Sequence, residues 1–197
     1  MRRTPGLARR RLSAFARDTR GVVSVEAAII APFLLGIFAA SFVWYDAFRT
    51  NNEVIKGTYT VADMISRQQT TLPEEAFDGL AYAFDFMVRS RTPTQLRITS
   101  IVCMEDCDDE TKRDLRMCWS WAQTGFAGFE PYDATTVEVL FPQVPLMTLG
   151  DTVVVTEGRV NYQPVFDRWL DEMELSNTIV TRPRFAPEIG YEDQECF

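Results

Sequence analysis

The sequence predicts an α+β protein in which an N-terminal transmembrane helix continues into a helical stem, followed by a helix packed on a mostly antiparallel sheet. Three observations predict this. A long apolar run follows an arginine-rich start, apolar residues then recur at helical spacing, and after residue 93 they alternate with polar ones. The predicted segments are 1–21, a basic leader; 22–45, a transmembrane helix; 46–70, a helical stem; and 71–197, the α+β domain.

The predicted membrane helix is the clearest element. Ala27–Tyr45 contains no charged residue, and Val22–Val25 extends the apolar run with only Glu26 between them. As a helix, 22–45 would measure about 36 Å at about 1.5 Å per residue, which exceeds a hydrocarbon core of roughly 30 Å. A cleaved secretory signal is the alternative, but large rings such as Trp44 stand where small residues should mark a cleavage point.

Charge is distributed unevenly along the chain. Residues 1–21 contain seven Arg and one Asp, whereas residues 22–197 contain 13 basic and 27 acidic residues. Because positive flanks stay in the cytoplasm, the leader should be cytoplasmic and the domain should lie outside the membrane. The acidic domain would repel phosphate backbones, so we expect no nucleic-acid partner.

Composition argues against an enzyme. The chain has no His, and its lysines are Lys56 and Lys112. Serine–histidine and cysteine–histidine catalysis and His-ligated zinc are therefore excluded. The acidic run 105–110 lacks the spacing of a calcium loop, so a solvated loop is expected. We predict no catalytic residue, no cofactor, no metal site and no small-molecule substrate.

Two helical segments follow the membrane helix. In residues 46–70, apolar positions such as Val54, Val61 and Ile65 recur at near-helical spacing, which predicts the stem. A second helix should begin near residues 71–75, where acids follow Pro73, and end near Ser90. Its predicted buried face consists of Phe77, Leu80, Ala81, Phe84, Met87 and Val88.

The rest of the chain reads mainly as strands. A period of two from Thr94 predicts a strand, with 116–123 as its antiparallel partner across the polar loop 105–115. Further strands are predicted at 135–141, 152–163 and 178–185, the last at an edge because it contains Pro183. We also predict a short helix at 165–173 and a mobile acidic tail at 188–195.

Four cysteines form an even set that favours two disulfides outside the cytoplasm. They allow three connectivities. The facing ends of the predicted hairpin favour Cys103 with Cys118, which leaves Cys107 with Cys196. A four-thiolate zinc site is the alternative, although paired C-x-x-C motifs are missing.

The start of the apolar run has a distinctive order of residues. Gly21 ends the basic leader, Val22 begins the apolar run and Glu26 is the fifth residue after Gly21. An acid at the centre of a membrane helix costs roughly 2.5–3.5 kcal/mol on insertion scales, and less near the end. Glu26 could simply lie at headgroup depth, where the helix dipole tolerates an anion.

This order resembles the type IV prepilins, whose leader a membrane peptidase removes after the glycine. The resemblance implies a processing site at Gly21 and Val22 as the new N-terminus. It also implies that Glu26 pairs with the terminal amine of a neighbouring subunit during assembly.

A more specific resemblance covers both ends of the chain. Gly21–Leu35 with Pro32, and the later segments Val153–Pro164 and Thr181–Phe185, are similar to the TadE/TadG-like family of tight-adherence (Flp, type IV-like) pilus assembly proteins and pseudopilins. Some relatives keep their N-terminus, so cleavage remains open.

The resemblance implies a pilin-like fold and a structural or assembly subunit, a minor pilin or pseudopilin, in the bacterial inner membrane with its domain in the periplasm. Its implied partners are other pilin-like or assembly subunits, a prepilin peptidase and the lipid bilayer. Whether the chain enters the filament, primes it or scaffolds its assembly stays open. The alternative is a single-pass membrane-anchored periplasmic module that binds a ligand or another protein.

Overall fold

The computed structural model describes residues 15, 21–125, 127–194 and 196, and it divides the chain into two compact units, Met1–Trp44 and Tyr45–Phe197. Except for Phe15 and Gly21, the predicted leader lies outside the described residues. Helix α2, Val22–Ser66, supplies residues to both units. The expected α+β class is confirmed by a long apolar N-terminal helix, further helical segments and a four-stranded antiparallel sheet.

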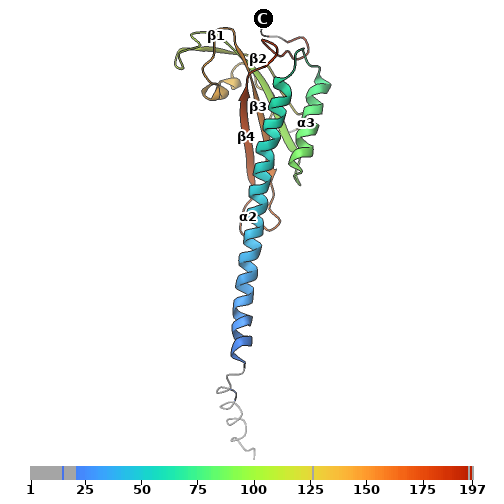
Figure 1. Ribbon diagram of the computed structural model, residues 1–197, viewed down its shortest axis with the longest axis vertical. Coiled ribbons are helices and arrows are strands. Elements are labelled where there is room, and N and C mark those ends of the chain that lie inside the picture. The colour runs from blue at the N-terminus through green and yellow to red at the C-terminus, as the bar shows by residue number, and fades with distance from the viewer. Residues whose placement is uncertain (1–14, 16–20, 126, 195, 197) are drawn as a thin grey trace, which may run out of the picture. The chain divides into compact units, whose positions relative to one another are not determined.

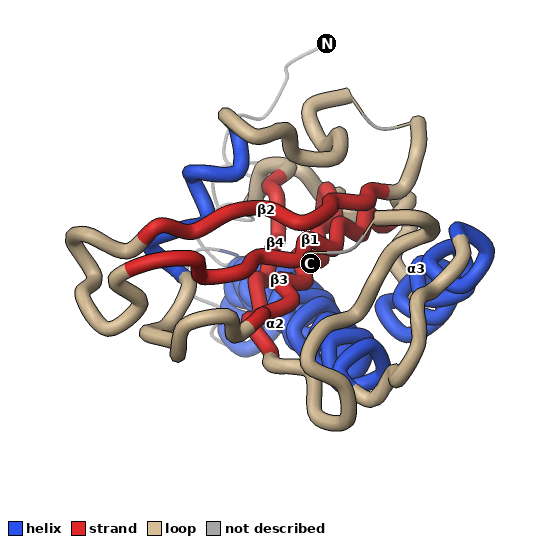
Figure 2. Tube along the Cα trace, turned by 90° about the horizontal axis from the view of Figure 1, so that it is seen from above, coloured by secondary structure: helices blue, strands red, loops and turns tan. Residues whose placement is uncertain are grey.

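The second unit is a sheet with helices on one face. The strands are β1 (Thr94–Glu105), β2 (Asp114–Ala122), β3 (Thr152–Tyr162) and β4 (Met173–Thr181), in the order β2-β1-β3-β4. All neighbouring strands are antiparallel. Helix α3, Glu74–Val88, and the C-terminal part of α2 lie on the same side of this sheet (Figures 1 and 2).

The core between helices and sheet follows from two periodicities. On α2, residues 54, 57, 58, 61, 62 and 65 are buried, which is one stripe of a 3.6-residue repeat. On β1, the even-numbered residues face this stripe because strand side chains alternate between faces. The resulting cluster includes Val54, Val61, Ile65, Phe77, Phe84, Leu96, Ile98, Trp119, Trp121, Val154 and Val160.

Two glycines let the layers approach closely. A Cβ at Gly158 on β3 would lie 2.6 Å from the Phe84 ring and would also collide with the Thr58 hydroxyl. A Cβ at Gly57 on α2 would lie 2.9 Å from the same ring. Phe84 therefore fills the space that both glycines leave, and it joins α2, α3 and β3.

The opposite face of the sheet is covered by the segment between β2 and β3. This segment contains the 3-10 helix η1, Thr136–Gln143 (Figure 2). Its cluster includes Ile101, Cys103, Leu115, Val137, Leu140, Val144, Met147, Val153 and Val155. β1 and β3 are therefore buried on both faces, whereas β2 and β4 form the edges.

The strand predicted at 135–141 is wrong, since these residues belong largely to η1. The Asp133 carboxylate accepts hydrogen bonds from the amides of Thr135 and Thr136, both at 2.8 Å, and this closes a turn. Pro142 then lacks the amide that a central strand would need. Val137 is buried while Val139 is exposed, although a strand would place both on one face.

Predictions after β3 are partly wrong. Residues 165–172 form turns and loops rather than a helix, and the last strand begins at Met173 instead of 178. It is an edge strand as predicted, but Pro183 lies beyond its end.

The described part of the acidic tail is packed against the domain. The Leu72 amide donates to the Gly190 carbonyl oxygen, and the Glu192 amide donates to the Leu72 carbonyl oxygen, both at 3.0 Å. Ile189 is buried in the helix-side core.

The residues predicted as a stem have a different role. Residues 46–66 are helical, as expected, but Val54, Val61 and Ile65 belong to the core of the second unit. The apolar spacing that predicted the stem is the stripe by which α2 packs on the sheet.

Candidate functional site

The predicted processing site lies at the start of α2. Gly21 is in a turn, and its carbonyl oxygen accepts the Val25 amide at 3.1 Å, the first hydrogen bond of the helix. No described atom within 4 Å would contact a Cβ at Gly21. The Gly21–Val22 peptide bond therefore joins the leader to a regular helix.

Glu26 projects from the first turns of α2. Its side chain is exposed and makes no ion pair within the described part of the chain. The neighbouring side chains are apolar and equally exposed, including Val25, Ile29 and Ile30. No described residue of the chain therefore pairs with Glu26, and its exposed side chain is accessible to a lipid headgroup or to another molecule.

The first part of α2 is suited to a membrane. Among the described residues, one helix, Val23–Ser66, is long and apolar enough to cross a bilayer. Consecutive residues Phe33, Leu34 and Leu35 are all exposed, so the apolar surface extends around the helix. This helix fits a single-pass membrane anchor.

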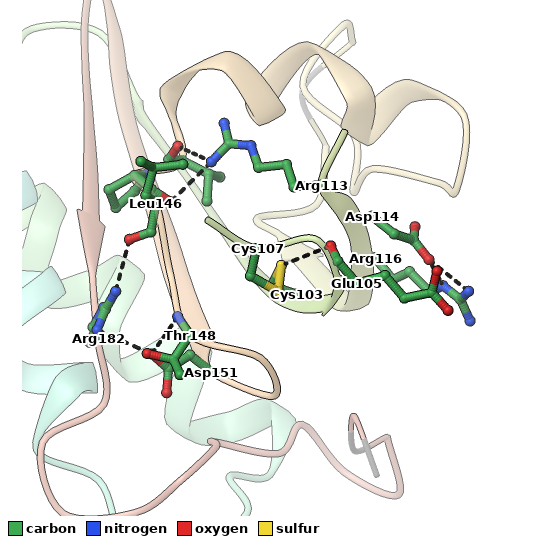
Figure 3. The surroundings of a disulfide bond; sticks show 12 residues. Cys103, Glu105, Cys107, Arg113, Asp114, Arg116, Leu146, Thr148, Asp151 and Arg182 are labelled. Carbon is green, nitrogen blue, oxygen red and sulfur yellow. Dashed lines mark hydrogen bonds and ion pairs between the residues drawn. A yellow bond between two sulfur atoms is a disulfide. The ribbon is translucent and has the colours of Figure 1, made fainter. Parts of the chain in front are cut away.

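The first disulfide joins Cys103 and Cys107, four residues apart at the end of β1 (Figure 3). It holds the segment that follows η1, because the Met147 amide donates to the Cys107 carbonyl oxygen at 3.4 Å and Gly150 donates to that of Cys103 at 2.9 Å. In the same region, the Arg113 guanidinium donates to the backbone oxygens of Phe141 and Val144, both at 2.7 Å.

The second disulfide joins Cys118 of β2 to Cys196, 78 residues later. Next to it, the Trp119 indole nitrogen donates to the Ile189 carbonyl oxygen at 2.7 Å. The C-terminal segment is thus fixed on the helix side of the sheet. Both disulfides fit an oxidising compartment.

The predicted pairing of Cys103 with Cys118 is wrong, and so is the remaining pair of Cys107 with Cys196. The hairpin exists, but its register places Leu115 opposite Cys103. A bulge between Ser100 and Ile101 leaves Cys118 unpaired in the ladder. Cys103 packs in the η1-side core and Cys118 against the helix-side core, so their sulfur atoms lie on opposite faces.

A polar cavity of about 200 Å³ lies where α2, the end of α3 and the end of β3 meet within the second unit. It is lined by Asp46, Arg49, Thr50, Glu53, Arg89, Ser90, Arg91, Tyr162 and Gln163. Tyr162 donates to the Asp46 carboxylate at 2.9 Å, and Arg91 lies 3.7 Å from the same carboxylate. Burial, followed by the hydrogen bond to Asp46, raises the pKa of Tyr162 to about 12.

The face opposite the helices has a network centred on Arg97. Its guanidinium binds both oxygens of Glu157, at 2.8 and 3.0 Å, and donates to the Tyr132 hydroxyl. The same guanidinium stacks on the Tyr132 ring at 3.7 Å, and Arg159 lies 4.4 Å from the centre of the Phe129 ring. Burial, then the Glu157 charge, raises the pKa of Tyr132 to about 12. The ion pair between Arg97 and Glu157 holds the guanidinium in place on the sheet. The guanidinium in turn binds Tyr132 and so fixes the loop after β2 to the sheet.

Neither cluster was predicted from the sequence, because its members are far apart in the chain. A weak signal for the first was present: Asp46 and Arg49 follow the end of the apolar run by one and four residues. Among the described residues, no group of three or more Cys, Asp or Glu side chains is placed to hold a metal ion.

Comparisons of the chain with protein-family models, curated proteins and solved structures found no match.

Proposed function

We propose that this chain is a structural or assembly subunit, a minor pilin or pseudopilin, of a tight-adherence (Flp) type IV pilus system. In this proposal α2 anchors it in a bacterial inner membrane, with the N-terminus cytoplasmic and the α+β domain periplasmic. Its partners are other pilin-like subunits, a prepilin peptidase and the bilayer.

The observation that carries the proposal is Glu26 at the start of an exposed apolar helix. It is the only charged residue from Val22 to Tyr45, and no described residue forms an ion pair with it. A carboxylate removed from water is stabilised only by a partner. If the leader is cleaved after Gly21, the ammonium of Val22 on a neighbouring chain is such a partner, and their pairing would set the axial register of the helices.

The rest of α2 supports assembly in an apolar environment. Side chains on every side of the helix between Val23 and Phe42 are exposed in the single chain. Lipid covers them in the membrane, and other apolar helices could replace lipid in a filament. Pro32 lies inside this part of the helix and lacks an amide for the helical ladder.

The anchored binding module is less well supported. The polar cavity at the end of β3, about 200 Å³, is smaller than the roughly 300–1,000 Å³ of typical small-molecule pockets. Depressions of about 470 and 520 Å³ near Cys107 and Arg113 are more open to solvent.

The decisive test is Glu26→Gln beside Glu75→Gln, a matched exposed acid on α3. Loss of a buried pair leaves one charge uncompensated at a cost of roughly 3–5 kcal/mol. We therefore expect Glu26→Gln to insert and be processed normally but to lose cross-links to other subunits and most surface pili. Glu75→Gln should retain both, and normal assembly by Glu26→Gln would exclude the pairing.

Processing needs its own test because assembly and cleavage can be separated. Co-expression with the cognate peptidase should yield a chain beginning at Val22, and Gly21→Val should block its formation. Intact-mass measurement gives the result directly. A retained Met1 in cells that make normal pili would exclude cleavage and leave a non-processed assembly role.

A further inference from the structure

We propose that the β3–β4 connection, residues 163–172 (the interfacial loop), is a second membrane contact of this chain, lying in the lipid headgroup layer next to the point where α2 leaves the bilayer. This inference goes beyond a role in pilus assembly. It requires only that the apolar part of α2 spans the membrane.

The fold places the interfacial loop at the end of the second unit where that unit's part of α2 begins. The residue directly before it is hydrogen-bonded to the residue directly after the apolar run, through the 2.9 Å contact of Tyr162 with Asp46. Arg91 adds a hydrogen bond to the Gln163 carbonyl oxygen at 3.5 Å. Figure 1 shows the β3–β4 connection at this end of the sheet, away from the end where the Arg184 amide binds the Ser66 carbonyl oxygen at 2.8 Å.

The interfacial loop exposes large apolar side chains. Val165, Phe166 and Trp169 are 43%, 47% and 40% exposed, and the two rings lie 6.2 Å apart in an edge-to-face pair. The Trp169 indole N–H has no acceptor within the described residues, unlike that of Trp119. An apolar ring with a free polar tip is the side chain that membrane interfaces favour.

Charged residues near the interfacial loop favour lipid headgroups as its contact and limit how deeply the loop enters the membrane. Arg49, Arg89 and Arg91 line the polar cavity at the same end of the unit, together with Asp46 and Glu53. Arg49 pairs with Glu53 at 2.9 Å and Arg91 with Asp46 at 3.7 Å, which leaves Arg89 without an ion pair among the described residues. Arginine is suited to phosphate groups. Asp167 lies between the two rings in sequence, and Asp171 and Glu172 are exposed at the end of the loop. These carboxylates disfavour hydrocarbon. The rings can therefore enter the headgroup layer while the acids remain in water.

A second protein is a weaker candidate for the same surface. Lipid is favoured because the aromatic surface of the loop continues onto α2 at the end of the apolar run. There Tyr45 and Phe48, both exposed, lie on either side of Asp46 in the sequence. Together with the interfacial loop they give a band of aromatic residues at the level where a spanning helix meets the headgroups. Such bands are characteristic of membrane interfaces.

The test is fluorescence quenching of the full chain in phosphatidylcholine vesicles with or without bromine in the upper acyl chain. In Trp44→Phe, where Trp119 and Trp121 remain buried, Trp169 should dominate the bromine-sensitive emission. We expect brominated lipid to lower this emission at least about twofold, since an interfacial indole contacts the upper acyl chain. The additional change Trp169→Phe should abolish the effect.

A matched control tests position. Phe185→Trp in the double variant introduces an indole at a residue that is 63% exposed, next to Arg184 and at the far end of α2. It should be insensitive to bromine and accessible to aqueous iodide. Trp169→Phe with Trp44 retained should be quenched by bromine, which verifies the anchor.

Three outcomes would overturn the proposal. Trp169 could be accessible to iodide and insensitive to bromine, which means that the loop is in water. It could be protected from both, which means that protein covers it. Loss of bromine quenching at Trp44 as well would remove the anchor on which the inference rests.

Discussion

The two parts of α2 show how one helix can be stabilised in two ways. Between Val23 and Phe42 its apolar side chains are exposed on every side, whereas between Val54 and Ile65 a single stripe is buried by the sheet and α3. The described chain stabilises the first part only through the helix's own turns; in the proposed function, lipid or neighbouring subunits supply the remaining contacts. The second part is stabilised within the domain. Substitutions should therefore act on the second part through folding and on the first through membrane insertion.

The largest effect should come from the core of the second part. Phe84 is fully buried against α2 and β3, while Phe86, two residues along α3, is 62% exposed. Phe84→Ala should lower the free energy of unfolding by about 3–5 kcal/mol, and Phe86→Ala by less than about 1 kcal/mol. Denaturant unfolding of the full chain in detergent measures both. Equal losses would mean that α3 does not cover α2 as described.

One disulfide should have an effect comparable to that of Phe84, and the two disulfides should differ from each other. In the chain-entropy model the link between Cys118 and Cys196, with a separation of 78, contributes about 4.5 kcal/mol, whereas that between Cys103 and Cys107, with a separation of 4, contributes about 2 kcal/mol. Double Cys→Ser variants should lose stability in this order, and neither should raise the fraction of the chain that carbonate extracts from membranes. Non-reducing peptide mapping checks the pairing first; a peptide linking Cys103 to Cys118 would refute it.

Much of this architecture could be predicted because the spacing of apolar residues in the sequence matches the spacing of buried residues in the structure. The alternation from Thr94 and the apolar stripe from Phe77 to Val88 correctly indicated β1 and α3. The long apolar helix that could cross a membrane was equally clear from length and composition. The same spacing in 54–65 gave the helix but not its location, because an amphipathic stripe does not reveal what covers it.

The failures involve tertiary contacts that local patterns do not contain. A single bulge at Cys118 moved its sulfur to the other face and changed both disulfides. The Asp133 side chain, whose hydrogen bonds to Thr135 and Thr136 hold its pKa well below the usual range, closes a turn where the sequence indicated a strand. The two polar clusters could not be predicted, since Asp46 and Tyr162 meet only after the sheet forms.

A charge in the first part of α2 should have a smaller but specific effect. Ile37 and Tyr59 are similarly exposed, at 64% and 57%, but lie in the two different parts of the helix. Ile37→Arg should raise the cost of membrane insertion by about 3 kcal/mol, while Tyr59→Arg should change it by less than about 0.5 kcal/mol. Carbonate extraction of membranes measures the inserted fraction. Equal extraction of the two variants would remove the distinction between the parts.

The smallest expected effect concerns Tyr162, which binds the carboxylate where the second part of the helix begins. Tyr162→Phe should cost about 1 kcal/mol at neutral pH, since Asp46 keeps Arg91 at 3.7 Å. The pH dependence is more diagnostic. The folded pKa of Tyr162 is raised from 10.0 to about 12. The stability linked to its neutral form is therefore complete below pH 10 and is lost as the pH rises toward 12, because the unfolded phenol ionises first.

The parent chain should lose up to about 2 kcal/mol over this interval through Tyr162, and Tyr162→Phe should lose correspondingly less. Tyr132→Phe, which removes a phenol with a similarly raised pKa in the Arg97 network, provides the comparison. Parallel alkaline stability profiles for the parent and Tyr162→Phe would show that burial and Asp46 do not hold the phenol neutral. The contact between Tyr162 and Asp46 would then not link the end of β3 to α2.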